Sequence, residues 1–142
     1  MRLPDTVTAL IERGPLTTCI TRNPDGGPQV SCVWVGVEEG EVFFVSLPEN
    51  RKVRNLRRNP RVVLVMPAGS RNPVGMEEYC VLHGHARIEA GGGPERLQRL
   101  AHTYVGPDSV FPPMSDPPPG HVIRVEALRF GGLGPWTADS GG

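Results

Sequence analysis

The motifs that usually reveal an enzyme's chemistry are missing from this sequence of 142 residues. It has no serine in a nucleophile elbow and no Walker phosphate loop. The glycine-rich run at 131–134 follows a predicted strand but opens no helix, so it is not a dinucleotide-binding fingerprint. No side chain is therefore assigned as catalytic. If the chain is an enzyme, a bound cofactor carries the chemistry and the protein binds and orients it.

Long apolar runs and a signal peptide are also missing. No run approaches the roughly 20 residues that span a membrane, and the N-terminus lacks the pattern of a secretory signal. We therefore expect a cytoplasmic protein with no membrane partner. The three cysteines, Cys19, Cys32 and Cys80, lie far apart within apolar segments, which favours free, buried thiols. One disulfide with a leftover thiol stays open as an alternative.

Acidic residues are absent between Glu49 and Glu77, although the formal net charge of the whole chain is +0. Six arginines and Lys52, the only lysine in the chain, lie inside this window. Because the positive charge is confined to one segment, it indicates a local anionic ligand rather than general affinity for nucleic acid. The segment also lacks the interleaved aromatic residues that stack on bases.

The middle of this window, residues 50–61, lies between two apolar runs and predicts a short helix. Asn50 is a candidate N-cap, because its side-chain oxygen can accept a hydrogen bond from a free amide. Pro60 ends the helix, since the residue before a proline is pushed out of the helical region. Val53 and Leu56 are three residues apart and can share the face that packs on the protein.

Two cations, Arg51 and Lys52, fall in the first turn of this predicted helix. The helix dipole disfavours cations there by roughly 0.3–1 kcal/mol each. A phosphate docked on the first-turn amides would offset that cost and bind both side chains. A solvated basic helix face explains the same charges, and this stretch alone does not separate the two interpretations.

Short apolar segments separated by turn residues run through the whole chain. Strands in hairpins favour an antiparallel barrel over a doubly wound sheet. We predict a mainly β (α+β) fold with a single domain, 1–142, and a flexible C-terminal tail, 131–142. The predicted helices are 4–13, with Asp5 as its cap, 50–60 and 95–105; the predicted strands are 16–22, 28–37, 42–46, 61–66, 77–89 and 121–130; and polar loops are expected at 68–75 and 106–120.

His83 and His85 lie two residues apart in a predicted strand and therefore on the same side of it. Such a pair could bind a metal, but a zinc site needs three or four ligands. No cysteine or carboxylate is spaced to complete the set, so ordinary strand histidines are the favoured interpretation and no metal site is predicted.

The order of these segments resembles the pyridoxamine 5'-phosphate oxidase-like family of FMN-binding split β-barrels. Within that family it looks most like the reductases that depend on the deazaflavin coenzyme F420. The resemblance covers roughly residues 3–136 and implies a six-stranded antiparallel split β-barrel with short connecting helices. It is carried by residues 16–22, 25–31, 52–61 and 98–104 and by the closing turn with Pro135 and Trp136.

The resemblance also implies where a cofactor binds. Members of the family pair as homodimers and hold a flavin or deazaflavin in a groove between the subunits. The cofactor phosphate would be bound by Arg51 and Lys52, preceded by Asn50. The ring would lie along two strands, and one residue would face it from the partner chain. These positions match Ser31, Cys32, Val33 and Trp34 on one strand, Val45 and Ser46 on the next, and Tyr79 from the partner.

Departures from the family pattern favour the deazaflavin branch. Ser31 stands where the flavin-binding oxidases have an arginine, and their C-terminal substrate-binding arginine and histidine are absent. We expect hydride transfer from reduced F420 to a small unsaturated acceptor, in a pocket shaped by Trp34, Tyr79 and Trp136, with a proton from water or Tyr79. The alternatives are an FMN-dependent oxidase or reductase, a non-catalytic cofactor carrier, and a basic-helix binder of nucleic acid.

Overall fold

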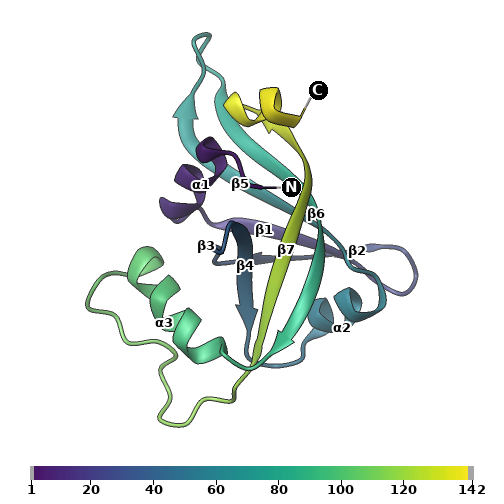
Figure 1. Ribbon diagram of the computed structural model, residues 1–142, viewed down its shortest axis with the longest axis vertical. Coiled ribbons are helices and arrows are strands. Elements are labelled where there is room, and N and C mark those ends of the chain that lie inside the picture. Colours follow the sequence, from purple (N-terminus) through teal and green to yellow (C-terminus); the bar gives the residue numbers. More distant parts are fainter. Residues whose placement is uncertain (1, 141–142) are drawn as a thin grey trace.

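The computed structural model describes residues 2–140 as one seven-stranded antiparallel sheet with helices at its connections (Figure 1). The strand order is β2-β1-β5-β6-β7-β4-β3. The predicted mainly β fold class is confirmed, with seven strands instead of six. The elements are α1 (Asp5–Glu12), β1 (Thr17–Arg22), β2 (Pro28–Val33), β3 (Gly36–Glu38), β4 (Glu41–Ser46), α2 (Arg51–Arg58), β5 (Arg61–Arg71), β6 (Glu77–Ala90), α3 (Gly93–Tyr104), β7 (His121–Leu133) and the 3-10 helix η1 (Pro135–Ser140).

The extra strand arises because the predicted strand 28–37 breaks after Val33. Its first part, β2, pairs with β1, and its second part, β3, pairs with β4 at the opposite edge of the sheet. The chain thus crosses from one edge to the other at Trp34. Gly36 permits a close approach there, because a Cβ atom on it would lie 2.8 Å from the Phe43 ring and 2.9 Å from Leu100. The apolar alternation of the sequence runs straight through this break and conceals it.

The main core lies between the inner face of the sheet and the helices α1 and α2. Val7, Leu10 and Ile11 of α1 are buried, as are Val53 and Leu56 of α2, the pair predicted to pack. The cap of α1 is Pro4, without a side-chain hydrogen bond, so the prediction of Asp5 as the cap is wrong. Asp5 is instead the first helical residue, where its negative charge interacts favourably with the positive end of the helix dipole.

β5 and β6 form a long hairpin that projects from the rest of the fold at the top of Figure 1. β5 continues to Arg71, so the first half of the loop predicted at 68–75 is strand and only residues 72–75 form a turn. Asn72 closes the turn: its Oδ1 accepts hydrogen bonds from the amides of Val74 at 3.1 Å and Met76 at 2.9 Å. The prediction failed because the polar composition of this segment resembles a loop, while the ladder resumes after a bulge and ends at Arg71 and Glu77.

At the C-terminus, residues 131–133 belong to β7 and residues 135–140 to η1, not to the tail predicted from residue 131. Trp136 is 2% exposed, and its indole Nε1 donates to the Tyr79 carbonyl at 3.0 Å. This indole is therefore a core side chain, which fixes η1 against β6. Residues 141 and 142 of the predicted tail lie outside the described residues.

All three cysteines are free thiols, but only Cys19 and Cys80 are buried. Cys32 is exposed, so the prediction of three buried thiols is wrong for this residue. It lies on the edge strand β2 opposite Thr18 and points away from the main core. Within residues 2–140, no helix is long and apolar enough to cross a bilayer.

Candidate cofactor site

The first turn of α2 is built as its sequence predicts. The Asn50 side chain caps the helix, its Oδ1 accepting a hydrogen bond from the Val53 amide at 3.3 Å. The remaining first-turn amides have no acceptor within the helix and are available to an anion. Asn59, before Pro60, is extended and ends the helix.

The basic residues of α2 divide into two groups according to their partners. Three arginines in and beyond the second turn contact oxygen atoms of the protein. Among the described residues, the side chains of Arg51 and Lys52 make no hydrogen bond or ion pair. The three partnered residues are Arg54, which donates to the Glu49 carbonyl at 2.8 Å, Arg57, which pairs with the Glu49 carboxylate at 2.5 Å, and Arg58, which donates to the Arg22 carbonyl.

Lys52 is half-buried beside Cys19. Burial lowers the pKa of its ammonium group, and the interaction with Cys19 opposes that shift. Burial also raises the pKa of the Cys19 thiol to about 12, so this neighbour is neutral at physiological pH and cannot balance the charge. The first turn of α2 therefore holds a partly desolvated cation with no counterion among the described residues, and a bound anion would stabilise it.

Ser31 lies directly opposite Cys19 in the β1–β2 ladder. Its hydroxyl oxygen is shielded from solvent and has no hydrogen-bond partner in the described part of the chain. Directly opposed residues in a ladder project to the same face, so Ser31 and Lys52 both flank Cys19. A polar group bound there would give both the hydroxyl and the ammonium a hydrogen-bond partner. The alternative interpretation, a solvated basic helix face, does not explain the unpaired hydroxyl.

The residues predicted to face the ring come from β2, from Trp34 just after it, and from β4, and these two strands are far apart in the strand order. The structure brings two of them together: Trp34 and Val45 pack against the same cluster of Phe43, Leu100 and Val122. Val33 belongs to the main core, and the Ser46 hydroxyl donates to the Pro48 carbonyl at 2.7 Å. That bond shapes the turn between β4 and α2.

The Trp34 ring is already held between two aromatic side chains of its own chain. It stacks on Tyr104 at 5.3 Å between centroids with an interplanar angle of 13°, and lies 5.1 Å from Phe111. The Tyr104 hydroxyl in turn donates to the Pro15 carbonyl at 2.7 Å and accepts from the Val35 amide at 3.0 Å. Trp34 is therefore fixed by α3 and by the proline-rich loop that follows it.

Tyr79 is not near the first turn of α2 within one chain. It is 44% exposed and lies near the start of β6, on the projecting hairpin, whereas α2 lies beside the later part of β6 (Figure 1). A contribution of this residue to the site would have to come from a second copy of the chain.

Sequence reasoning missed Asn55, which is 1% exposed. Its Nδ2 donates to the Thr21 hydroxyl and to the Asn23 side-chain oxygen, both at 3.0 Å. These bonds tie α2 to the β1–β2 hairpin and so fix the direction of the first turn. The sequence does contain a signal for this role. An asparagine stands between the buried residues Val53 and Leu56, and asparagine is uncommon inside helices unless its side chain has a hydrogen-bond partner.

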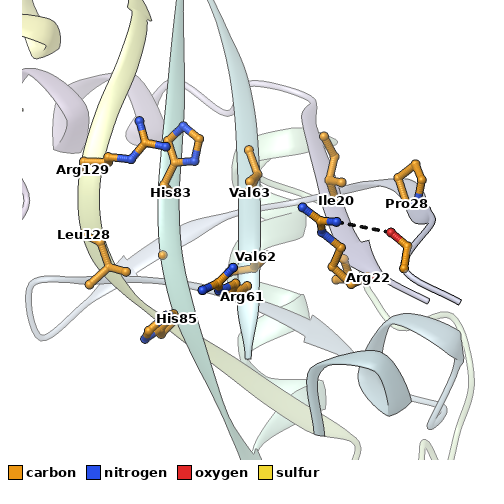
Figure 2. A pocket seen from close by; sticks show the side chains of 13 residues that line it. Ile20, Arg22, Pro28, Arg61, Val62, Val63, His83, His85, Leu128 and Arg129 are labelled. Atoms are coloured by element: carbon orange, nitrogen blue, oxygen red, sulfur yellow. Dashed lines mark hydrogen bonds between the residues drawn. The ribbon is translucent and has the colours of Figure 1, made fainter. Parts of the chain in front are cut away.

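A hollow with a volume of about 650 Å³, separate from the α2 site, lies on the outer face of the sheet (Figure 2). His83 and His85 both line it, which confirms that they share one side of β6. Within residues 2–140, no three histidine, cysteine or acidic side chains are grouped to hold a metal ion. None of the lining residues is acidic, and its other side chains include Arg22, Arg61 and Arg129 around Ile20, Val63 and Leu128.

Gly84, between the two histidines, faces the core where β6 and β7 approach closely. A Cβ atom at this position would lie 2.5 Å from the Val125 side chain and 2.6 Å from the Glu126 carbonyl oxygen. The β6–β7 register shifts between His83 and Gly84. Glycine thus allows the bulge that directs Arg129 and Leu128 toward the histidines.

Comparisons with known proteins agree with this architecture. Three solved structures share the fold. An F420 reductase is 24% identical with a TM-score of 0.70, and the match covers 91% of this chain and 98% of that chain. The conserved hypothetical protein Rv2991 from Mycobacterium tuberculosis is 23% identical (TM-score 0.67, 90% of this chain and 82% of that chain), and a Listeria innocua protein assigned provisionally as a pyridoxamine 5'-phosphate oxidase is 20% identical (TM-score 0.64, 91% and 96% of the two chains). No curated protein sequence matches the chain. The family model described as Pyridoxamine 5'-phosphate oxidase matches residues 3–133. The chain therefore belongs to the pyridoxamine 5'-phosphate oxidase family.

Proposed function

We propose that this protein is an oxidoreductase that uses the reduced deazaflavin coenzyme F420 to transfer a hydride to a small unsaturated acceptor. The observation that carries the proposal is the pair of cations on the capped first turn of α2, Arg51 and Lys52, whose side chains have no hydrogen bond or ion pair within residues 2–140. The fold shared with an F420 reductase supports the choice of cofactor.

The cofactor phosphate binds at the first turn of α2. The Arg51 guanidinium can donate two parallel hydrogen bonds to phosphate oxygens, and the Lys52 ammonium supplies a compact charge beside them. The first-turn amides complete the anion site. Phosphate binding replaces the missing counterion of Lys52 and raises its lowered pKa again.

The cofactor ring would lie along the end of β2 with Trp34 and along the end of β4. Backbone groups of residues 31–34 and 45–46 would orient it, and the unpartnered Ser31 hydroxyl could donate to a polar atom of the cofactor. Once bound, the deazaflavin supplies the hydride, so no nucleophile or metal is needed in the protein. The proton reaches the acceptor from water or from the Tyr79 hydroxyl of a second subunit.

The proposed active form is a homodimer with a cofactor groove between its two copies. The separation of Tyr79 from α2 within one chain supports this arrangement. Because Trp34 is fixed by Tyr104 and Phe111, its exposed edge can serve as a rigid wall for the acceptor.

FMN is the second candidate cofactor. The family match supports it as an alternative, because the family is named after an oxidase and the oxidases it resembles bind flavin. FMN also carries a phosphate and a tricyclic ring, so the anion site suits both molecules. A protein that binds either cofactor without turning over an acceptor would be a carrier of the same fold.

Titration of cofactor-free protein with F420 and with FMN, followed by fluorescence, tests the proposal. We expect F420 to bind more tightly, and Lys52→Ala to weaken its affinity 10- to 100-fold, the equivalent of about 1.5–3 kcal/mol for a charged hydrogen bond. Arg57→Ala is the matched control, since Arg57 pairs with Glu49. The proposal fails if neither cofactor binds or if Lys52→Ala binds as tightly as the wild type; tighter FMN binding selects the alternative.

A further inference from the structure

The loop that follows α3 is held by one side chain of that helix, Gln98. Its Oε1 accepts a hydrogen bond from the Phe111 amide at 2.9 Å, and its Nε2 donates to the Ser109 carbonyl at 2.8 Å. The same Nε2 lies 3.0 Å from Nε2 of His102, which can accept its second hydrogen when the imidazole is neutral. The two bonds to the loop, one accepted and one donated, fix the orientation of the amide and the position of residues 109–111.

The held segment is also ordered within its own backbone. The Ser109 amide and hydroxyl both donate to the Gly106 carbonyl, at 3.1 Å and 2.7 Å, which closes a turn just after the helix. Pro112 and Pro113 follow directly, and each proline fixes its own φ angle. Phe111 therefore lies on a short, restrained piece of backbone although it belongs to no helix or strand.

The two bonds from Gln98 accompany an inward orientation of the Phe111 ring. Phe111 is half-buried, and its ring centroid lies 5.1 Å from that of Trp34 with an interplanar angle of 54°. Val110, between the two residues that Gln98 holds, is 80% exposed. Together with Tyr104, which stacks on Trp34, Phe111 completes a cluster of three half-buried rings.

This three-ring cluster borders the region where the proposed cofactor ring would lie. Trp34 follows the end of β2, and it packs with Val45 of β4 on one apolar cluster. Residues 31–34 and 45–46 are those proposed to orient the ring, so an acceptor stacked on the ring at this edge would meet Trp34 and Phe111. Aromatic side chains favour offset-stacked or edge-to-face contact with other π-systems, so this wall suits a flat aromatic acceptor.

We infer that Phe111 is a specificity-determining residue of the acceptor site and that Gln98 is the residue that positions it. The acceptor class that fits is a conjugated carbonyl compound with an aromatic ring next to its reducible double bond. The inference rests on the proposed function for the reaction itself and adds the substrate class and these two residues. Phe111 contacts the aromatic ring of the acceptor, whereas Gln98 acts through Phe111 and does not touch the substrate.

Acrylamide quenching of tryptophan fluorescence tests the positioning role on cofactor-free protein. Trp136 is 2% exposed, so the quenchable fluorescence comes from Trp34. Gln98→Met keeps the length of the side chain but loses both bonds to the loop. We expect it roughly to double the quenching constant, because the released segment opens locally and uncovers Trp34. Val110→Ala, in the same segment, is the matched control and should leave the constant unchanged. An unchanged constant in Gln98→Met overturns the positioning role.

Steady-state kinetics with reduced F420 tests the substrate class. Benzylideneacetone and 3-penten-2-one share a methyl ketone and a conjugated double bond, and differ in a phenyl or a methyl group on the β-carbon. In either enone the β-carbon gains a hydride as F420 is oxidised, and the α-carbon gains a proton that comes ultimately from water. We expect the wild type to prefer the phenyl enone by about tenfold in kcat/KM, the size of a well-formed aromatic contact.

Phe111→Leu keeps an apolar side chain but removes the ring, so it should lose most of this preference. The loss should appear as a raised KM for the phenyl enone, with kcat and the F420 affinity unchanged. Gln98→Met should shift the KM in the same direction, and Val110→Ala should keep the wild-type preference.

Failure of this inference differs from failure of the proposed function. A wild type that binds no F420 in the cofactor titration overturns both. A wild type that binds F420 but reduces neither enone, or shows no preference for the phenyl enone, overturns the inferred substrate class alone. A preference that survives in Phe111→Leu overturns the role of Phe111, while the cofactor titration still stands.

Discussion

Two clusters of cations in this protein differ in what neutralises them. At Glu38 on β3, one carboxylate accepts hydrogen bonds from Arg96 and Arg99 at 2.8 Å and from Arg124 at 2.5 Å, joining α3 to the sheet. At the first turn of α2, two cations have no carboxylate within residues 2–140. The contrast shows that this chain uses its cations in two ways. Cations that the chain pairs internally hold elements together, and those left unpaired cost stability until a ligand arrives.

The Glu38 cluster is the more strongly perturbed of the two. Hydrogen bonds from Arg96 and then Arg124 hold the pKa of Glu38 down at about 2, against an ordinary value of 4.5. Arg124 is nearly buried, and hydrogen bonds to Glu89 and Glu38 raise its pKa. Its Nη1 is buried and has no partner among the described residues, so Glu38 and Glu89 are the carboxylates that compensate this guanidinium.

Removing the shared carboxylate should have the largest effect on stability. Glu38→Ala leaves Arg124 buried and only partly paired, and loss of one partner of such a pair costs about 3 kcal/mol or more. Urea unfolding measures this loss, and the F420 affinity of the folded variant should stay within a factor of two of wild type. Glu12→Ala, an exposed carboxylate on α1, should change the free energy of unfolding by about 0.5 kcal/mol or less. If Glu38→Ala lowers the free energy of unfolding by less than about 1 kcal/mol, the cluster does not have this structural role.

Acid should remove part of the same contribution in the wild type. Because the folded pKa of Glu38 is depressed, its stabilisation is complete above the unfolded value near 4.5 and is lost as the pH falls toward 2. The thermal midpoint of the wild type should therefore fall more steeply between pH 5 and pH 2 than that of Glu38→Gln. Circular dichroism melts at half-unit pH steps measure the difference. Parallel curves would show that the charge of Glu38 contributes nothing.

These two clusters also differ in how far the sequence reveals them. The α2 site was predictable because its signals are local: Asn50 as a cap, Val53 and Leu56 on one face, and two cations in the first turn. Glu38 and its partners Arg96 and Arg124 come from separate elements, and no spacing rule connects them. The break at Trp34 escaped prediction for a related reason, since strand alternation continues unchanged while the chain moves to the other sheet edge. Ser31 was predicted for the site only through the family resemblance, because its unpaired hydroxyl depends on the β1–β2 pairing and on burial, which the sequence does not reveal.

Asn50 allows the capping and binding roles of the α2 terminus to be separated. Asn50→Ala removes the acceptor for the Val53 amide and should cost about 1 kcal/mol of stability. Asn50→Asp keeps a strong cap and a favourable charge for the dipole, so its stability should match the wild type. Its carboxylate would nevertheless repel a phosphate bound at Arg51 and Lys52, weakening F420 binding about tenfold by electrostatic repulsion. If Asn50→Asp and the wild type bind F420 equally well in the same titration, the phosphate does not bind at this helix terminus.

The smallest effect should come from Arg57, which shares a helix with the unpaired cations but pairs with Glu49 in solvent. Both side chains are about half exposed, so Arg57→Ala should cost about 0.5 kcal/mol or less.

Arg51→Ala should leave stability unchanged yet weaken F420 binding about tenfold, since it removes charged hydrogen bonds to phosphate. Equal losses of affinity in the two variants would mean that the summed positive field of α2, and not contact with its first turn, attracts the cofactor. Repeating both titrations at several salt concentrations separates these cases, because a diffuse field is screened over about 10 Å at 0.1 M salt while direct contacts are screened much less.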